Sequence, residues 1–247
     1  MLMSVVERKS GVGVYPELAG ARVLVTGLTT ALGVDVARAF ADHKARLVVQ
    51  SPEDTPEMTE VAALLSESAG EIKVFNDPIA SPDEAVRLVQ GVVQELGGLD
   101  ALINIVTLDP AALSRDAGPS EIEDHVASKL LGAVLATRVA ANRMRLTLTQ
   151  GSILNIVAVP AEGGAASVIL ADIAYATLAA MTRGEAKEWA EQGIRINAVG
   201  PKTSASCVVA QAPDTGIAAL ALYLASKKGR GLSGHMLDAA GTASRIC

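Results

Sequence analysis

The stretch from Ala21 to Gly33 has the residue types and spacing to bind a phosphate group. An apolar run, Arg22 to Thr26, ends in a turn that contains Gly27 and Gly33 and passes directly into a helical pattern. A strand, a tight turn and a helix N-terminus together offer backbone N–H groups and the positive end of a helix dipole to an anion. The spacing alone is a weak signal, because Ala31 stands where a fuller glycine pattern carries a further glycine.

Strand-like and helical runs alternate along the chain, and these elements must position the turn. The predicted strands lie near Arg22–Thr26, Arg46–Gln50, Glu71–Phe75, Ala101–Val106, Ser152–Val159, Ile194–Val199 and His235–Asp238. The predicted helices lie near Ala31–Ala41, Pro56–Ala69, Pro82–Leu96, Ser120–Met144, Ala165–Glu191 and Asp214–Ser226. This alternation predicts an α/β fold, with a doubly wound parallel sheet in a single Rossmann domain and helices on both faces.

In such sheets ligands bind at the carboxyl ends of the strands. We therefore expect any site to lie among the segments that follow the strands, namely Gly27–Gly33, Gln50–Pro52, Asn104–Asp109, Ala158–Gly164 and Gly200–Ser206.

The composition of the chain limits which partners and which cellular compartment we expect. The chain has 247 residues, half of them hydrophobic, a net charge of −6 and only 2% aromatic residues, which argues against nucleic-acid binding. Two cysteines are too few for a disulfide framework, and the three histidines lack metal-ligand spacing, so no metal is expected. No apolar run reaches membrane-spanning length, so we expect a cytoplasmic protein with no membrane partner. Residues 1–18 are predicted to be a mobile or partner-docked extension, and residues 19–247 one domain.

Five motifs in order resemble the short-chain dehydrogenase/reductase family over about Leu18 to Gly241. They are Thr26-Gly27 with Ala31-Leu32-Gly33, Leu99 to Asn104, Gly151 to Ile156, Gly193 to Pro201, and Leu224 to Ser226 followed by Leu232 to Gly234. The resemblance implies oxidoreductase chemistry with NAD(P) as cofactor, and a homodimer or homotetramer formed through the long fourth and fifth helices. It also implies cofactor contacts at Thr26, Gly27, Thr29, Leu32, Gly33, Ser51, Asp77, Asn104 and Pro201.

The same alignment shows departures at the family's catalytic positions. In the family a Ser ends the fifth strand, and a Tyr-x-x-x-Lys pair lies on the next helix. The Tyr transfers a proton to the substrate oxygen, the Ser orients that oxygen, and the Lys lowers the pKa of the Tyr. These positions are occupied here by Ala158, Ala171 and Tyr175. A methyl group neither donates a proton nor hydrogen-bonds an oxyanion, so we predict that the family's chemistry is lost.

Other positions of the cofactor cleft depart from the family as well. Ser51 and Pro52 replace the acid or arginine that addresses the adenosine ribose, and Thr107 replaces a glycine of the turn after the fourth strand. Lys129 stands where the family has an Asn. The stretch from Lys202 to Pro213 is too short for the two small helices that cover the substrate in the family, so we expect an incomplete lid.

Three functions remain open from the sequence. The first is a family member with a degenerate active site that acts as a weakly nucleotide-binding or scaffold subunit, in a homo-oligomer or beside an active homologue. The second is an active NAD(P)-dependent oxidoreductase of a carbonyl or alcohol, with Tyr175 as proton donor and Lys129 lowering its pKa. The third is a purely structural or interaction protein that uses residues 1–18 and its apolar helix faces.

Overall fold

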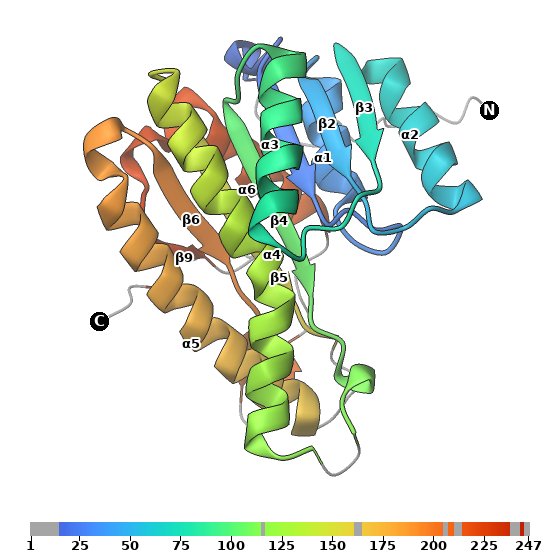
Figure 1. Cartoon of the computed structure of the whole chain (residues 1–247), viewed down its shortest axis with the longest axis vertical. Coiled ribbons are helices and arrows are strands. Elements are labelled where there is room, and N and C mark those ends of the chain that lie inside the picture. The colour runs from blue at the N-terminus through green and yellow to red at the C-terminus, as the bar shows by residue number, and fades with distance from the viewer. Residues whose placement is uncertain are drawn as a thin grey trace, which may run out of the picture.

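The computed structural model describes residues 15–114, 117–160, 165–204, 207–209, 214–237 and 243–244 (Figure 1). Its centre is an eight-stranded sheet in the order β10-β9-β6-β5-β4-β1-β2-β3. The strands are β1 Arg22–Thr26, β2 Arg46–Gln50, β3 Glu71–Phe75, β4 Ala101–Thr107, β5 Ser152–Ala158, β6 Arg195–Val199, β9 Met236–Leu237 and β10 Ala243–Ser244. Neighbouring strands pair parallel except β10, which pairs antiparallel with β9.

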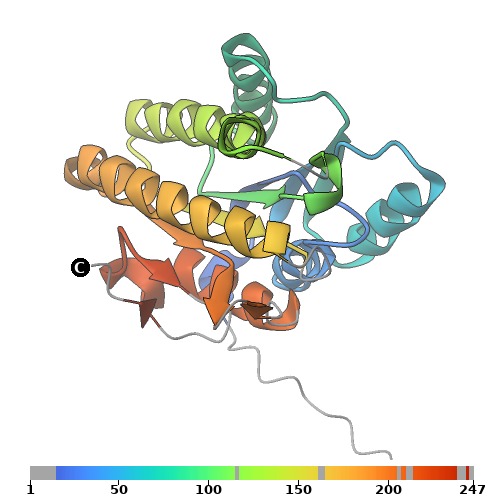
Figure 2. The same cartoon turned by 90° about the horizontal axis from the view of Figure 1, so that it is seen from below.

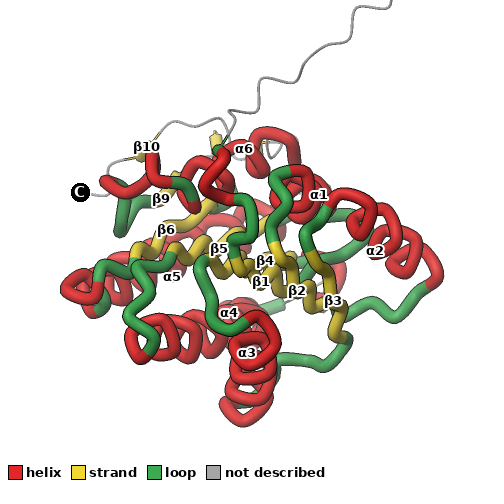
Figure 3. The backbone as a smooth tube through the Cα atoms, turned by 90° about the horizontal axis from the view of Figure 1, so that it is seen from above, coloured by secondary structure: helices red, strands yellow, loops and turns green. Residues whose placement is uncertain are grey.

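In the part of the chain that the structure describes, six α-helices cover the two faces of the sheet. Viewed along the strands, α3, α4 and α5 lie on one side and α1, α2 and α6 on the other (Figure 3). Their bounds are α1 Val34–Asp42, α2 Pro56–Ser68, α3 Pro82–Leu96, α4 Pro119–Leu146, α5 Ala165–Glu188 and α6 Asp214–Ala225. Because helices shield both faces, the central strands are apolar along most of their length, as β4 and β5 are. The predicted doubly wound α/β fold is therefore confirmed.

The first helix begins three residues later than the sequence predicts. Ala31 and Leu32 belong to the turn, and Gly33, with φ of 93°, is the N-cap of α1. A residue with a Cβ is strained at that φ, so the chain cannot enter the helix before Val34. The turn itself is closed by two hydrogen bonds, from Thr29 N to Leu32 O and from Leu32 N to Thr29 O.

Residues just before β1 also pack against the domain. Pro16–Leu18 form a short 3₁₀ helix, η1, and the side chains of Tyr15 and Leu18 are buried in the same core cluster as α1 and α6. Glu17 Oε1 accepts a hydrogen bond from the Lys227 backbone N–H. The packed domain thus includes residues 15–18, which were predicted to belong to the extension; residues 1–14 lie outside the described part.

The segment predicted to be too short for a helical lid contains a hairpin. Strands β7 Lys202–Ser204 and β8 Cys207–Val209 pair antiparallel and contact α5. Seen from the carboxyl ends of the strands, this hairpin lies beside α5 on the side away from α4 (Figure 2). Residues 205–206 and 210–213 lie outside the described residues.

One prediction about apolar runs was wrong. Helix α5 is long and apolar enough to cross a membrane, by length and composition alone. Its apolar side chains, among them Leu170, Ala174 and Leu178, pack into a core cluster with β5 and β6. A helix buried in the core of a globular protein passes the same hydropathy test, so α5 is weak evidence for a membrane span.

Candidate functional site

The glycine turn between β1 and α1 passes directly over β4 at the carboxyl edge of the sheet. Gly27 has φ of 70°, and a Cβ built on it would overlap the carbonyl oxygen of Ile105 in β4. A side chain is therefore excluded at Gly27 both by the backbone angle and by the contact. The predicted turn is present, and its shape is the one that offers N–H groups to a phosphate.

The N–H groups of this turn already have acceptors inside the protein. The Gly27 N–H donates to Oε1 of Gln50 at 2.8 Å, and the Thr30 N–H donates to Oε2 of Glu53 at 2.9 Å. The Leu28 N–H donates to the carbonyl of Gln50 at 3.1 Å, and Leu32 donates to Thr29 Oγ1 at 3.1 Å. A carboxylate and an amide thus occupy the donors that a ligand phosphate would need.

The space beside the last glycine of the turn is also filled. A Cβ built on Gly33 would overlap the δ-methyl group of Ile105 and would contact Leu28. Both Ile105 and Leu28 are buried in the cluster that joins β1, α1 and β4. The glycine therefore leaves room for the Ile105 side chain in this structure.

Two of the predicted cofactor residues belong instead to a buried polar cluster beneath the turn. The strand register places Thr26 of β1 beside Asn104 of β4, and Asn104 beside Asn155 of β5. Asn104 Oδ1 accepts from the Thr26 hydroxyl at 2.7 Å, and its Nδ2 donates to Asn155 Oδ1 at 2.7 Å. Thr137 of α4 completes the cluster by donating to Asn155 Oδ1 at 3.2 Å. These four buried side chains tie three strands and a helix together.

The residues that follow β2 form hydrogen bonds within the protein. Ser51 is fully buried, and its Oγ accepts from the Glu53 N–H at 3.0 Å. Asp77 is exposed, and its carbonyl accepts from Gln50 Nε2 at 3.0 Å. Pro201, just after β6, is buried. The structure thus gathers the turn, Ser51 and Asp77 around Gln50, a residue that the sequence analysis placed in the region without giving it a role.

Two of the three residues predicted to stand at the family's catalytic positions are apolar and buried. Ala158, the last residue of β5, is 7% exposed, and Ala171 on α5 is fully buried. Tyr175 is partly buried; its ring lies next to Gly200 and packs against the core cluster that contains Leu170 and Leu178 of α5. Lys129 is exposed on α4, and the described residues show no hydrogen bond between it and Tyr175. The described residues therefore show the two alanines buried and no hydrogen bond joining the two candidate substitutes.

A cavity of about 650 Å³ lies at the carboxyl edge, between the segment after β4 and the start of α5. Its polar side chains have internal partners: Asp109 Oδ1 accepts from the Ala111 N–H at 2.9 Å, and the Ser114 hydroxyl donates to Glu121 at 2.9 Å. The Ser114 N–H and hydroxyl hold the pKa of the Glu121 carboxyl below its ordinary value. The remaining walls are mostly apolar, including Leu113, Ile122 and Ile169.

The opposite, amino-terminal edge of the sheet carries a well-formed ion pair. Arg22 Nε and Nη2 donate to the two carboxylate oxygens of Asp100 at 2.8 and 2.6 Å, and the Arg22 N–H adds a third bond at 2.9 Å. Burial raises the pKa of Asp100, but these hydrogen bonds and the Arg22 charge outweigh it, so the pKa is lowered. This pair joins β1 to the start of β4, far from the glycine turn.

The fold and the turn define a doubly wound protein of the dinucleotide-binding type. The family model described as short chain dehydrogenase matches residues 21–215, and the chain belongs to this family. An uncharacterised oxidoreductase of Mycobacterium bovis is 27% identical over 236 residues, which cover 88% of this chain and 94% of that protein.

Solved structures agree with this assignment. A short chain dehydrogenase from Mycobacterium smegmatis superposes with a TM-score of 0.75 at 26% identity, covering 93% of this chain and 94% of that one. An NADH-dependent reductase solved in complex with NAD has a TM-score of 0.74 at 23% identity, covering 94% of this chain and 99% of that one.

Family membership makes NAD(P) the cofactor class to test against the residues present. The glycine turn has the right shape, but its donors are engaged by Gln50 and Glu53 and its free space is taken by Ile105. Family membership supports NAD(P) binding, while in this structure the protein's own side chains accept hydrogen bonds from the turn and fill the space beside Gly33. No group of three or more His, Cys, Asp or Glu side chains able to hold a metal ion occurs among the described residues.

Sequence reasoning missed the two side chains that engage the turn. Gln50 ends β2 and Glu53 follows three residues later, so the two flank Ser51 and Pro52, the positions where the family was expected to carry an acid or arginine. The signal was an amide at the strand end followed closely by an acid. Their direction toward Gly27 and Thr30, 23 residues away in the chain, depends on how β1 and β2 pair.

Proposed function

We propose that this protein is a member of the short-chain dehydrogenase family with a degenerate active site, acting as a weakly nucleotide-binding or scaffold subunit. The observation that carries the proposal is the burial of Ala158 and Ala171 at the two positions that would hold the substrate oxygen and donate the proton. Reduction of a carbonyl needs a proton donor within hydrogen-bond reach of the oxygen that receives it. A methyl group at both positions supplies none.

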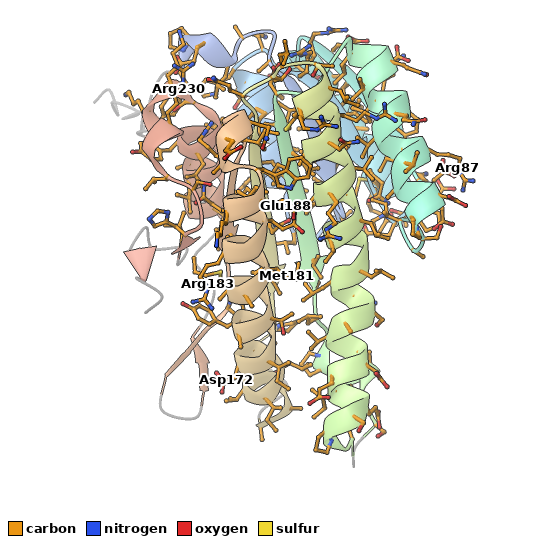
Figure 4. All side chains as sticks on the ribbon, turned by 60° about the vertical axis from the view of Figure 1, so that its left-hand side comes forward. Arg87, Asp172, Met181, Arg183, Glu188 and Arg230 are labelled. Carbon is orange, nitrogen blue, oxygen red and sulfur yellow. The ribbon has the colours of Figure 1, made fainter. Side chains whose placement is uncertain are left out.

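The subunit role rests on the long helices α4 and α5, which the family resemblance makes the oligomer surface. Leu131 on α4 and Ile169 on α5 are large apolar side chains with exposed fractions of 42% and 45%. Within the subunit, Arg138 of α4 bonds Glu185 of α5 at 2.9 Å. Figure 4 shows Glu188 and Met181 between these two helices, and Arg183 on the other side of α5. We propose a homodimer or homotetramer, or a hetero-oligomer with an active homologue, in the cytoplasm.

Turnover of a panel of aldehydes, ketones and secondary alcohols, with NADH, NADPH and their oxidised forms, tests the proposal. The wild type and the Tyr175→Phe variant are compared at equal concentration and with matched melting temperatures. The proposal predicts no turnover above the protein-free rate in either. Turnover by the wild type that is lost in Tyr175→Phe and weakened in Lys129→Met would replace it with the active oxidoreductase, in which Tyr175 is the donor.

A further inference from the structure

We infer that Gln50, Glu53 and Ile105 form an internal plug that competes with a dinucleotide for the glycine turn. The inference rests on the proposed function only in taking this turn as the remnant of a dinucleotide site. It concerns binding and not turnover, so each can fail while the other stands. We call these three residues the plug.

The first part of the plug is the side-chain amide of Gln50, which accepts a hydrogen bond from the turn. Gln50 uses both ends of its side chain: Oε1 accepts from the Gly27 N–H at 2.8 Å, and Nε2 donates to the Asp77 carbonyl at 3.0 Å. Gln50 is also 4% exposed, so neither bond competes freely with water. A ligand oxygen that accepts the Gly27 N–H must displace the buried Gln50 side chain, which is held by two hydrogen bonds.

The second part is a negative charge at the mouth of the turn. Glu53 Oε2 lies 2.9 Å from the Thr30 nitrogen, where it accepts a hydrogen bond as a ligand phosphate oxygen would. Ser51 Oγ accepts from the Glu53 N–H at 3.0 Å and donates to the Glu53 carbonyl at 3.2 Å, which fixes the backbone from which this carboxylate extends. A second anion brought to the same N–H groups is repelled by the carboxylate.

The third part is steric. The δ-methyl group of Ile105 lies against Gly33, and the residue is only 5% exposed. The lack of a side chain at Gly33 therefore makes room for Ile105 and not for a ligand. Together the three parts predict that NADH binds weakly, with a dissociation constant above about 1 mM.

Removing the charge alone should strengthen binding. The test measures NADH and inorganic pyrophosphate binding by calorimetry to the full-length wild type and to Glu53→Gln. The matched control is Glu60→Gln, which makes the same change of charge at an exposed position of α2. Relief of one like-charge contact at the surface predicts that Glu53→Gln binds both probes about five- to tenfold more tightly at low salt. The gain should shrink as added salt screens the charge, and Glu60→Gln should match the wild type.

Ile105→Ala gives a second route that does not depend on charge. It should also strengthen NADH binding, with little dependence on salt, and its melting temperature is measured alongside because the residue is buried. If Ile105→Ala fails to fold, the Glu53→Gln comparison still decides.

Three results would overturn the plug. One is micromolar NADH binding by the wild type. Another is unchanged affinity for both probes in Glu53→Gln. The last is weaker NADH binding with unchanged pyrophosphate binding in Glu53→Gln, which would make Glu53 a group that holds the adenosine ribose.

Discussion

Two layers at the carboxyl edge of the sheet differ sharply in their side chains: the lower one is polar and hydrogen-bonded, and the upper one is apolar. Beneath the glycine turn, Thr26, Asn104, Thr137 and Asn155 form a buried polar cluster in which every member is hydrogen-bonded to another. Above it, the positions that would face a cofactor and substrate hold Ala158, Ala171 and the Ile105 side chain. The lower layer joins strands and so is needed by the fold itself. The upper layer is apolar and buried as well, and the loss of the family's chemistry there remains our proposal.

The largest expected effect tests whether the lower layer is structural. Asn104→Ala removes the acceptor for Thr26 and the donor for Asn155 and Thr137, leaving their polar atoms buried. We expect the free energy of unfolding to fall by about 3 kcal/mol, measured by urea denaturation.

The control for that variant is Asn76→Ala. Asn76 is exposed and bonds only the side chain of Asp54 among its described contacts. Its change should stay within about 0.5 kcal/mol. Equal losses in the two variants would show that the buried polar cluster contributes nothing special to stability.

A glycine pair tests the turn that separates the two layers. Gly27→Ala should destabilise by about 2–3 kcal/mol, because its φ of 70° and the Ile105 carbonyl both exclude a Cβ. Gly91→Ala, inside α3 with nothing near the added carbon, should stabilise by about 0.5–1 kcal/mol. Thermal or urea unfolding measures both. A stable Gly27→Ala variant would mean that the turn is looser than the close passage over β4 requires.

The ion pair at the far edge predicts a pH dependence. The pKa of Asp100 is lowered in the folded state, so its contribution is complete above the unfolded value near 3.9 and is lost as pH falls through the lower, folded pKa. Because the Asp100 side chain is 37% exposed, we discount the pair to about 1 kcal/mol. Asp100→Asn should lose that amount at pH 7, and its gap from the wild type should narrow below pH 4.

Measuring the free energy of unfolding of the wild type and Asp100→Asn between about pH 2.5 and 7 checks the direction of this pH dependence, because that range flanks the ordinary aspartate pKa of about 3.9. Asp124→Asn, on the exposed side of α4, is the matched control and should follow the wild type. A gap that widens in acid would contradict the lowered pKa of Asp100.

The smallest expected effect lies in the upper layer. Ala158→Ser restores the hydroxyl that ends the fifth strand in the family, at a position that is 7% exposed. We expect a stability change below about 1 kcal/mol and no carbonyl turnover, since no phenol stands at Ala171. A gain of turnover from this one hydroxyl would show that a working proton donor is already present.

The sequence predicted the parallel sheet, seven of its eight strands and the turn because these depend on local patterns, while the two-residue antiparallel strand β10 was not predicted. Apolar runs such as Ala101–Val106 mark buried strands, and the glycines mark the turn between β1 and α1. The sequence also predicts a loss of the family's chemistry at Ala158 and Ala171, from their places relative to Gly151 and Gly193, and this stays a prediction. Whether that loss abolishes catalysis remains a proposal.

The engagement of the turn could not be predicted, because it depends on side-chain direction. The bond from Gly27 to Gln50 joins the ends of two strands, and its existence depends on the pairing of β1 with β2. The contact of Ile105 with Gly33 depends likewise on how closely the turn approaches β4. The β7–β8 hairpin was not predicted, because its strands are only three residues long and give no strand pattern; the sequence predicted only an incomplete lid there.

A crystal structure of the protein grown with excess NADH tests the central claim most directly. Our account predicts that Gln50 still accepts from Gly27 and Glu53 from Thr30, with no dinucleotide on the turn. It would be contradicted by a dinucleotide whose pyrophosphate takes those two N–H groups while the Tyr175 hydroxyl lies within hydrogen-bond reach of the nicotinamide's reacting side.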